Sequence, residues 1–461
     1  MKARSTEDTI AAIATAQGEA GIGIVRLSGP EAVPIAASVF VSSRGCDITG
    51  PGRGRCVYHG EVRDHAGVID EVLLHVMRAP HTYTREDVVE INCHGGPGPL
   101  GAVLEALLER GARLAGPGEF TQRAFLNGRI DLVQAEAVID RIRARTRAAL
   151  RAADAAGTGR LSAAIYAMRD SLADALARIE AAVDFPEDDL PELVDQALRR
   201  RLEGVREQMS ELLDTARAGR LYREGAGVAI VGRPNVGKSS LFNALLRDAR
   251  AIVTPQPGTT RDLIEEVITI SGVPVRLSDT AGLRATDDEI EQMGVEIARG
   301  ALRNADAVLL LVDAAAPVSE DDELLAREVS ALDVPRLLVL NKIDLAPDAR
   351  PPAWAGAFGA CHPVSAKTAQ GLKELEAALG RLLLGDVAAG PDQGLITRLH
   401  QRDSLRRAAA ALDRLLANFT ASPEFLSIDL RDALDALGEI TGETTPEDIL
   451  DRIFSSFCIG K

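Results

Sequence analysis

The sequence predicts a multidomain protein that combines α/β and all-helical parts. Its 461 residues suit about three domains. Hydrophobic residues make up 46% of the chain but aromatic residues only 3%, so its cores must be mostly aliphatic. The hydrophobic spacing changes three times along the chain. We therefore expect an N-terminal α+β domain, followed by a helical domain into which a P-loop α/β domain is inserted.

The predicted N-terminal domain covers residues 1–120 and is rich in strands. Short aliphatic runs at 21–29, 71–77 and 87–92 are bounded by Gly, Pro or Asn, as strands commonly are. Residues 98–112 predict a helix that ends at a C-cap glycine, Gly111.

The helical domain is predicted in two pieces, residues 121–224 and 385–461. In the first piece apolar residues recur every three or four positions, which indicates one helix face, and Pro186 stops that helix. The stripe consists of Leu161, Ile165, Met168, Leu172, Leu176, Ile179 and Val183. Helical spacing is also found at Leu198, Leu202, Val205, Met209 and Leu212, and again at Leu395, Leu399, Leu405, Leu412 and Leu416. Because residues 225–384 alternate strands with helices, the economical interpretation is an α/β domain inserted into a helical bundle.

The charge balance argues against strong, non-specific binding of polyanions. The chain has 52 basic and 68 acidic residues, a formal net charge of -16. A nucleic-acid substrate would need a local basic patch or a partner that carries it. Two arginine clusters of the helical part could contact RNA phosphates, and the alternative is a solvated helix face paired with acids. They are Arg141, Arg143, Arg145, Arg147 and Arg151, and Arg199, Arg200 and Arg201.

The cysteines and the apolar runs predict a cytoplasmic protein. The five cysteines are scattered and form no C-x-x-C pair, so we expect reduced thiols. We expect no secretory signal, because no long apolar stretch follows the first basic residues. The longest aliphatic run, at 307–313, is too short to cross a membrane.

A phosphate-binding loop is predicted where the α/β part begins. Gly232, Gly237, Lys238 and Ser239 fit the pattern G-x-x-x-x-G-K-[ST] between an aliphatic run and a helix. In this pattern the lysine reaches the β- and γ-phosphates, and the serine hydroxyl ligates Mg²⁺. The alternative is a chance match in a glycine-containing turn, which the motifs that follow disfavour.

Three further motifs follow in the order that a Ras-like GTPase requires. D-T-A-G at 279–282 supplies an acid for the magnesium shell and a glycine that can sense the γ-phosphate. N-K-x-D at 341–344 places Asp344 to accept two hydrogen bonds from guanine, a pair that adenine cannot offer. V-S-A-K at 364–367 offers a backbone amide to the guanine oxygen. An ATPase would not need N-K-x-D, so these motifs predict a GTPase.

The predicted GTP site also includes a switch segment, residues 254–262, whose alternative is an ordinary Pro/Gly loop. Its Thr260 is expected to bind Mg²⁺ together with Ser239. The predicted GTP-binding residues are Asn235, Val236, Gly237, Lys238, Ser239, Ser240, Thr254, Gln256, Gly258, Thr259, Thr260, Asp279, Thr280, Ala281, Gly282, Asn341, Lys342, Asp344, Ser365, Ala366 and Lys367.

The residue after D-T-A-G is a leucine. Ras-like enzymes place a water-orienting glutamine there, and the apolar side chain of Leu283 cannot polarise water. Hydrolysis must then use another acid or base, an added cation or a partner. Glu291 lies just downstream, and on its own it predicts only a solvated helix residue.

Segments spread from Gly21 to Lys461 carry a further signal. They include PGEFTQRAFLNGRIDLVQAEAV, AAVDFPEDD, EITGE and the terminal DRIFSSFCIGK, beside GRPNVGKSSL, VTPQPGTTRD and DTAGLR. Together they resemble the MnmE (TrmE) family of tRNA-modification GTPases over nearly the whole chain. The combination of an FCIGK terminus with an inserted GTPase domain is very specific.

The resemblance implies a homodimer whose N-terminal domain binds 5-formyl- or methylene-tetrahydrofolate as one-carbon donor. It implies two GTPase domains that associate across the dimer when GTP is bound. It also implies a flavoprotein partner, MnmG (GidA), in a heterotetramer or larger complex. Together the two proteins would add an aminomethyl or carboxymethylaminomethyl group to carbon 5 of the wobble uridine of certain tRNAs.

The resemblance also assigns roles to individual residues. Asn235, Thr254, Gln256 and Thr259 match the family's potassium-binding positions, where K⁺ would neutralise charge as an arginine finger does. Glu291 matches a water-orienting glutamate, which would answer the problem posed by Leu283. The folate-contacting positions are matched by Arg26, Glu90, Arg129 and Lys461. Two positions depart from the family pattern: Arg129 stands where lysine is common, and Gly116 stands where a basic residue is common.

Two other functions compete with this one. The first is a GTP-dependent assembly or switch factor that does no modification chemistry, which the GTPase motifs alone do not exclude. The second is a lipid-anchored GTPase that uses Cys458 as a prenylation site, against which Gly460 and the terminal Lys461 argue. We expect Cys458 instead to be catalytic, as a nucleophile or a redox-sensitive thiol. The alternative is a small buried residue that positions Lys461.

Overall fold

The computed structural model describes residues 7–16, 18–50, 55–184, 194–248, 267–279, 305–385 and 390–461. Its internal contacts divide the chain into two compact units, Met1–Ile139 with Gly438–Lys461, and Asp140–Leu437. The last residues of the chain thus pack with the first unit, although the sequence assigns them to the helical part. The four predicted domain ranges stay a prediction.

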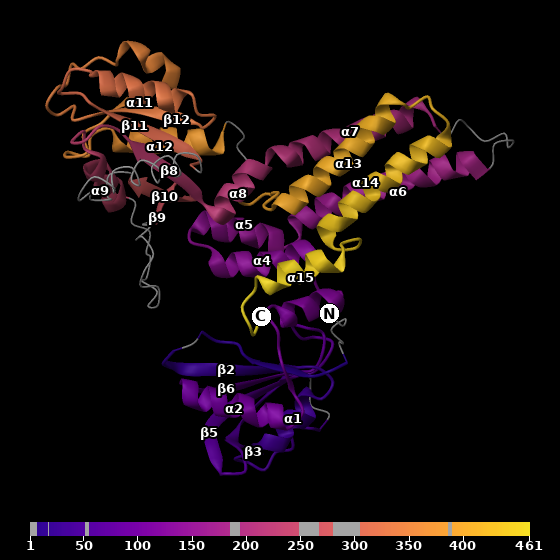
Figure 1. Ribbon diagram of the computed structural model, residues 1–461. Coiled ribbons are helices and arrows are strands. Elements are labelled where there is room, and N and C mark those ends of the chain that lie inside the picture. The colour runs from indigo at the N-terminus through magenta and orange to yellow at the C-terminus, as the bar shows by residue number, and fades with distance from the viewer. Residues whose placement is uncertain are drawn as a thin grey trace, which may run out of the picture. The chain divides into compact units, whose positions relative to one another are not determined.

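The first unit contains a seven-stranded sheet in the order β3-β4-β5-β6-β2-β1-β7. β1 pairs in parallel with β7, and the other neighbours pair antiparallel. The strands are β1 (Ile10–Ile13), β2 (Ala20–Ser28), β3 (Phe40–Ser42), β4 (Arg55–Arg63), β5 (Val68–Met77), β6 (Val88–Gly95) and β7 (Arg113–Leu114). Helices α1 (Ala32–Val39) and α2 (Pro97–Glu109) pack against this sheet and bury Val25 and Leu27 of β2 (Figure 1). The strands and the helix predicted for this region are confirmed as β2, β5, β6 and α2.

The chain's last residues complete a second core in the same unit. This core contains residues of α3 (Glu119–Leu126), α4 (Leu132–Arg143) and α15 (Glu447–Ser455). Phe454 and Phe457 pack there against Leu132 and Ile139, and all four are buried. Beyond α15, the Gly118 N–H donates to the Cys458 carbonyl oxygen at 3.3 Å. The C-terminal segment is therefore an integral part of this unit.

The second unit contains a six-stranded sheet in the order β13-β12-β11-β8-β10-β9. Its strands are β8 (Ala226–Val231), β9 (Val267–Ile270), β10 (Val273–Asp279), β11 (Ala307–Asp313), β12 (Arg336–Asn341) and β13 (Cys361–Pro363). All neighbours pair in parallel except β9 and β10. The strand β8 predicted ahead of the phosphate loop is thus confirmed, and it lies in the middle of the sheet.

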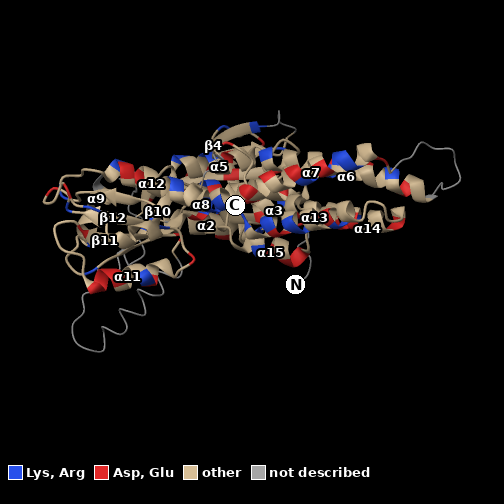
Figure 2. Ribbon diagram, turned by 90° about the horizontal axis from the view of Figure 1, so that it is seen from above, with Lys and Arg blue, Asp and Glu red and all other residues tan. Residues whose placement is uncertain are grey.

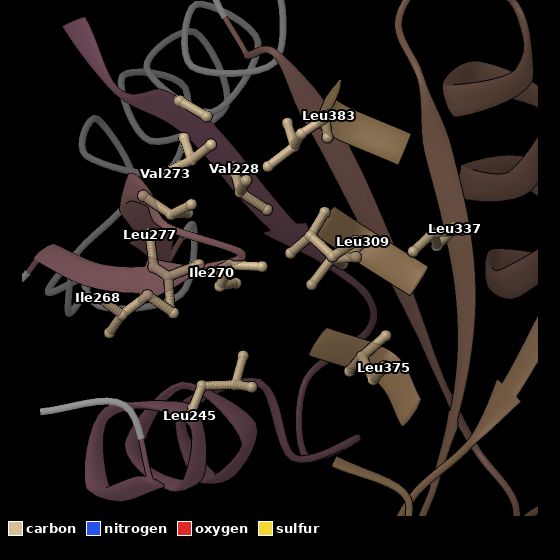
Figure 3. Packing of buried hydrophobic residues seen from close by; sticks show 14 of the residues in the cluster. Val228, Leu245, Ile268, Ile270, Val273, Leu277, Leu309, Leu337, Leu375 and Leu383 are labelled. Carbon is tan, nitrogen blue, oxygen red and sulfur yellow. The ribbon is translucent and has the colours of Figure 1, made fainter. Parts of the chain in front are cut away.

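Helices cover both faces of this sheet, as a parallel sheet requires. On one face lie α9 (Lys238–Asp248) and α12 (Leu372–Leu384), and Figure 3 shows Leu245, Leu375 and Leu383 in one cluster with Val228 and Leu309. The core on the other face contains residues of α11 (Glu320–Ser330) and of the 3₁₀ helix η1 (Ala353–Phe358). Because successive strand residues point to opposite faces, Leu309 of β11 enters the first core and Leu310 the second.

The remaining helices of the second unit precede and follow this α/β part. They are α5 (Arg147–Gly157), α6 (Arg160–Asp184), α7 (Gln196–Asp214), α8 (Ala216–Glu224), α13 (Leu399–Ala417) and α14 (Pro423–Thr441). The helices α6, α7, α13 and α14 run side by side as a bundle (Figure 1). The predicted apolar stripe is confirmed on α6, where Leu161, Ile165 and Leu172 are fully buried.

One predicted helical position is wrong. Leu395 lies before α13 begins, and it packs against the α/β core instead of continuing the helix. The predicted combination of α+β, helical and inserted α/β parts is otherwise confirmed. No helix within the described ranges is long and apolar enough to cross a membrane.

Candidate functional site

The predicted phosphate loop joins β8 to α9 at the carboxyl edge of the second sheet. Gly237 has a φ of +99°, and a Cβ there would lie 2.3 Å from Nδ2 of Asn341. Only glycine fits this position, because any side chain would be strained and would collide. Lys238 is buried, and its Nζ donates to the carbonyl oxygens of Gly232 and Arg233 at 2.7 and 2.8 Å. The exposed Ser239 and Ser240 follow in the first turn of α9.

Asn341 ties this loop to the V-S-A-K segment. It is the last residue of β12, and its side chain is 2% exposed. Its Nδ2 donates to the Val236 carbonyl oxygen at 2.9 Å, and its Oδ1 accepts from the Ala366 N–H at 3.1 Å. The asparagine of N-K-x-D thus holds two neighbouring loops in register.

Lys342 supports the same loop from the next position. Its backbone is left-handed, with a φ of +68°, and its Nζ donates to the Asn235 carbonyl oxygen at 2.8 Å. The same Nζ pairs with Asp313 Oδ2 at 2.6 Å. Asp313 was not among the predicted site residues. The signal that could have found it is its place at the end of β11, because parallel neighbours bring their carboxyl ends to one edge.

Asp344 lies on the wall of a pocket of about 660 Å³, a volume typical of small-molecule sites. Its Oδ1 accepts a hydrogen bond from the Ser365 hydroxyl at 2.7 Å, and Ser365 is fully buried. Gly237, Asn341 and Lys367 also line the pocket. The pocket therefore presents one carboxylate, with its orientation fixed, beside the phosphate loop. A carboxylate so placed can accept the paired N–H groups of guanine.

The first unit brings together three of the residues that the resemblance assigned to folate. Arg26 and Glu90 are paired partners on β2 and β6, and the arginine Nε donates to Glu90 Oε1 at 2.8 Å. Arg26 Nη1 also donates to the Gly460 carbonyl oxygen at 3.2 Å. Lys461, the residue after Gly460, is therefore tethered at this charged pair.

Aromatic rings lie beside these charges. The Arg26 guanidinium lies 5.6 Å from the centre of the Phe120 ring, and the Arg129 guanidinium lies 4.7 Å from that of Tyr83. Phe120 and Tyr83 belong to one apolar cluster, which links Arg129 to the same neighbourhood. At the departure from the family pattern, the Gly116 N–H donates to Glu119 Oε2 at 2.7 Å.

Comparisons with known proteins address the whole chain. Residues 9–129 match the GTP-binding protein TrmE N-terminus, and residues 132–458 match the MnmE helical domain. The tRNA modification GTPase MnmE of Chloroflexus aurantiacus is 50% identical over 98% of this chain and 100% of its own length. That of Heliobacterium modesticaldum is 48% identical over 98% of this chain and 99% of its own.

The chain belongs to the MnmE family. It is therefore a GTPase that acts in tRNA modification. The GTPase motifs, the resemblance and the inserted α/β part are all in accord with this membership.

Several predicted residues of the MnmE-type GTP site lie outside the described residues. They are Thr254, Gln256, Gly258, Thr259, Thr260, Thr280, Ala281, Gly282 and Glu291, together with Leu283. Asp279 is the last residue of β10, and only the backbone of this residue is described. The predicted Mg²⁺ and K⁺ ligands thus stay predictions. Among the described residues, no group of three or more His, Cys, Asp or Glu could hold a metal ion.

The cysteines of this MnmE-family chain differ in their accessibility. Burial raises the pKa of Cys93 to about 12 and also raises the pKa of Cys361, so both thiols stay protonated near neutral pH. Cys458 is exposed. The burial assumed in the alternative for Cys458 is therefore wrong, while its role in positioning Lys461 stays a prediction.

Several arginines of the predicted clusters belong to an ionic surface. Arg141 pairs with Asp154 at 2.7 Å and Arg201 with Asp174 at 2.7 Å, while Arg151 pairs with Asp392. Figure 2 shows basic and acidic residues interspersed along α6 and α7. These pairs favour the solvated-face interpretation for the arginines that form them.

Proposed function

We propose that this GTPase, together with the flavoprotein MnmG, adds an aminomethyl or carboxymethylaminomethyl group to carbon 5 of the wobble uridine. The observation that best supports this proposal is the Arg26–Glu90 pair, whose arginine also holds the Gly460 carbonyl oxygen. A one-carbon donor site needs charged groups, a flat apolar wall and a reactive side chain nearby. Arg26, Glu90, the half-buried Tyr83 and the exposed Cys458 supply those elements within one unit.

The residues at this place fit a tetrahydrofolate. A carboxylate such as Glu90 can accept the paired N–H groups of an aminopyrimidinone ring, and a guanidinium can donate to its oxygens or to a carboxylate tail. The half-buried ring of Tyr83 provides flat surface for the ring system, while Phe120 lies fully buried behind it in the same apolar cluster. When bound, 5-formyl- or methylene-tetrahydrofolate would supply the one-carbon unit. Arg26, Glu90, Arg129 and Lys461 would hold and orient it.

GTP hydrolysis would drive or gate this modification. Lys238 and the loop amides would bind the phosphates, with Mg²⁺ on Ser239 and Thr260. K⁺ on Asn235, Thr254, Gln256 and Thr259 would neutralise charge on the leaving phosphate, and Glu291 would orient the attacking water. In a cytoplasmic homodimer, the association of the two GTPase domains would complete this arrangement.

The test is nucleoside mass spectrometry of tRNA from cells with and without the gene. We expect the modified wobble uridine to disappear on deletion and to return with the wild-type gene. An Arg26→Ala variant should fail to restore it while it still hydrolyses GTP. If deletion left the wobble uridines modified, the proposed chemistry would be wrong.

A further inference from the structure

A second pocket in the unit Asp140–Leu437 is lined mainly by arginines. It has a volume of about 440 Å³ and lies where α8 meets the residues that lead into α13. Its two acidic lining residues are Asp214 and Glu224. Its arginines are Arg217, Arg220, Arg223, Arg398, Arg402 and Arg406.

The six arginines form two facing rows. On α8 they are spaced three residues apart, and at the start of α13 they are spaced four apart, so each row lies on one helix face. The rows are held together by a close approach at Gly219, where a Cβ would lie 2.2 Å from the Ile396 carbonyl oxygen. The Ile396 N–H also donates to the Thr215 hydroxyl at 3.1 Å. The pocket is therefore built into the packing of the helices.

The positive charge of the pocket is only partly neutralised. Arg220 pairs with Asp306 at 2.6 Å, Arg398 with Asp140 at 2.8 Å, and Arg402 with the exposed Asp403 at 3.0 Å. Two arginines, one from each row, have no carboxylate partner within the described ranges. Arg217 donates to the Leu382 carbonyl oxygen at 3.1 Å. Arg406 makes no hydrogen bond or ion pair with any of the described residues. In a chain of net charge -16, such a pocket concentrates positive potential locally.

We infer that this pocket binds phosphate groups of the tRNA backbone. Arginine forks match phosphate oxygens in geometry as well as in charge, and an arginine engaged at one nitrogen keeps donors for a second acceptor. No aromatic side chain lines the pocket, so it has no platform on which a base could stack. It would therefore position the RNA and would not read its sequence. The inference rests on the tRNA substrate of the proposed function.

The experiment compares two double variants of the full-length chain. Arg217→Gln/Arg406→Gln removes the two charges that lack carboxylate partners. Arg145→Gln/Arg147→Gln is the matched control. It removes two exposed arginines of the predicted cluster between Arg141 and Arg151, and these two have no ion pair within the described ranges. Binding of a fluorescent in vitro tRNA transcript is measured between about 50 and 200 mM KCl, the range in which phosphate contacts weaken strongly. GTP hydrolysis without tRNA is measured for each protein as a control for folding.

We expect the pocket variant to bind the transcript about tenfold more weakly at low salt, which corresponds to about 1.4 kcal/mol. Its slope of log K against log salt should be shallower by roughly 1.4–1.8, because two phosphate contacts are lost. The control should bind within about twofold of wild type, an energy change well below one phosphate contact. GTP hydrolysis should be unchanged in all three proteins.

Three results would overturn the inference. Normal tRNA binding by the pocket variant would show that the pocket does not bind tRNA. Equal weakening of tRNA binding in both variants would show that the arginines act only through the overall positive charge. Inorganic phosphate could compete with the transcript at matched ionic strength in the wild-type protein but not in the pocket variant. If the pocket variant also bound tRNA normally, the pocket would be assigned to free phosphate. The proposed wobble-uridine chemistry fails separately, in the nucleoside analysis of deletion cells.

Discussion

The buried side-chain amide of Asn341 donates to the Val236 carbonyl oxygen at 2.9 Å. This contact joins the end of β12 to the G-x-x-x-x-G-K-S loop. The base-reading and phosphate-binding parts of the predicted GTP site are therefore linked directly by a hydrogen bond within the protein.

Replacing Asn341 with Ala should weaken GTP binding. The change removes the donor to Val236 and the acceptor for Ala366, and it leaves buried backbone groups without these partners. The cost of such a loss is about 1–3 kcal/mol, which corresponds to roughly 5- to 150-fold in Kd. Calorimetric titration with a non-hydrolysable GTP analogue measures it. Asn92→Ala in the first unit is the matched control, and an unaltered Kd for Asn341→Ala would contradict the coupling.

GTP hydrolysis should be much faster in potassium than in sodium at equal ionic strength. The predicted cation site includes Asn235, whose backbone is left-handed with a φ of +65° and whose carbonyl oxygen accepts from Lys342 Nζ. Sodium is smaller and would fit ligands spaced for potassium poorly. Phosphate release in KCl and in NaCl is the measurement. Equal rates in the two salts would exclude the potassium site.

Changing Glu291 to Ala should slow hydrolysis and leave GTP binding close to normal. The predicted role of this carboxylate is to orient the attacking water, an interaction made in the transition state and not in the ground state. Single-turnover hydrolysis and nucleotide affinity are compared in one preparation. A loss of affinity in parallel with the rate would indicate a structural role instead.

A Cys458→Ser variant tests whether Cys458 acts chemically, as a nucleophile or a redox-sensitive thiol, or only helps to dock the C-terminal tail. Serine is close in size but is a much weaker nucleophile and is not readily oxidised. We expect this variant to lose tRNA modification while GTP hydrolysis is retained. Cys46→Ser is the control, because Cys46 is also exposed and free. Normal modification by Cys458→Ser would leave only the docking role.

The first unit should lose stability in acid. Arg123 is 2% exposed and contacts Asp8, Glu86 and Glu119. Burial raises the pKa of Glu119, but hydrogen bonds from Arg113 and the Gly116 N–H outweigh it, so the net pKa is lowered. Burial likewise opposes the hydrogen bonds from Arg113 and Arg123 that lower the pKa of Asp8. Because the folded pKa values lie below the unfolded ones, this stability is present above pH of about 4.3 and is lost as pH falls through the folded values.

Thermal unfolding of the first unit as a function of pH tests this sign. We expect its Tm to be nearly constant from about pH 8 to pH 5 and to fall below about pH 4. Glu119→Gln should cost about 3–5 kcal/mol at neutral pH, because it breaks a buried charge network, and should flatten the acid branch. Glu207→Gln on the exposed face of α7 is the control. An unchanged acid branch in Glu119→Gln would show that other groups set it.

Local patterns predicted much of the fold, because they depend on neighbouring residues. The stripe from Leu161 to Val183 follows from helical spacing, and the G-x-x-x-x-G-K-S loop from its glycines. Contacts between distant segments could not be predicted in this way. Asp313 beneath Lys342 required the strand order, and the misplaced Leu395 required knowledge of the core that it joins. The buried network around Arg123 has no sequence signature, because its partners come from positions as far apart as Asp8 and Glu119.

The packing of Phe454 and Phe457 against Leu132 and Ile139 has a consequence for biosynthesis. The ribosome makes Leu132 long before it makes Phe454, so this core cannot close until Phe454 and Phe457 have emerged from the ribosome. Until then, an apolar patch of the first unit would stay open to chaperones. A chain truncated before Phe454 would keep this patch exposed, which would make it a target for quality control.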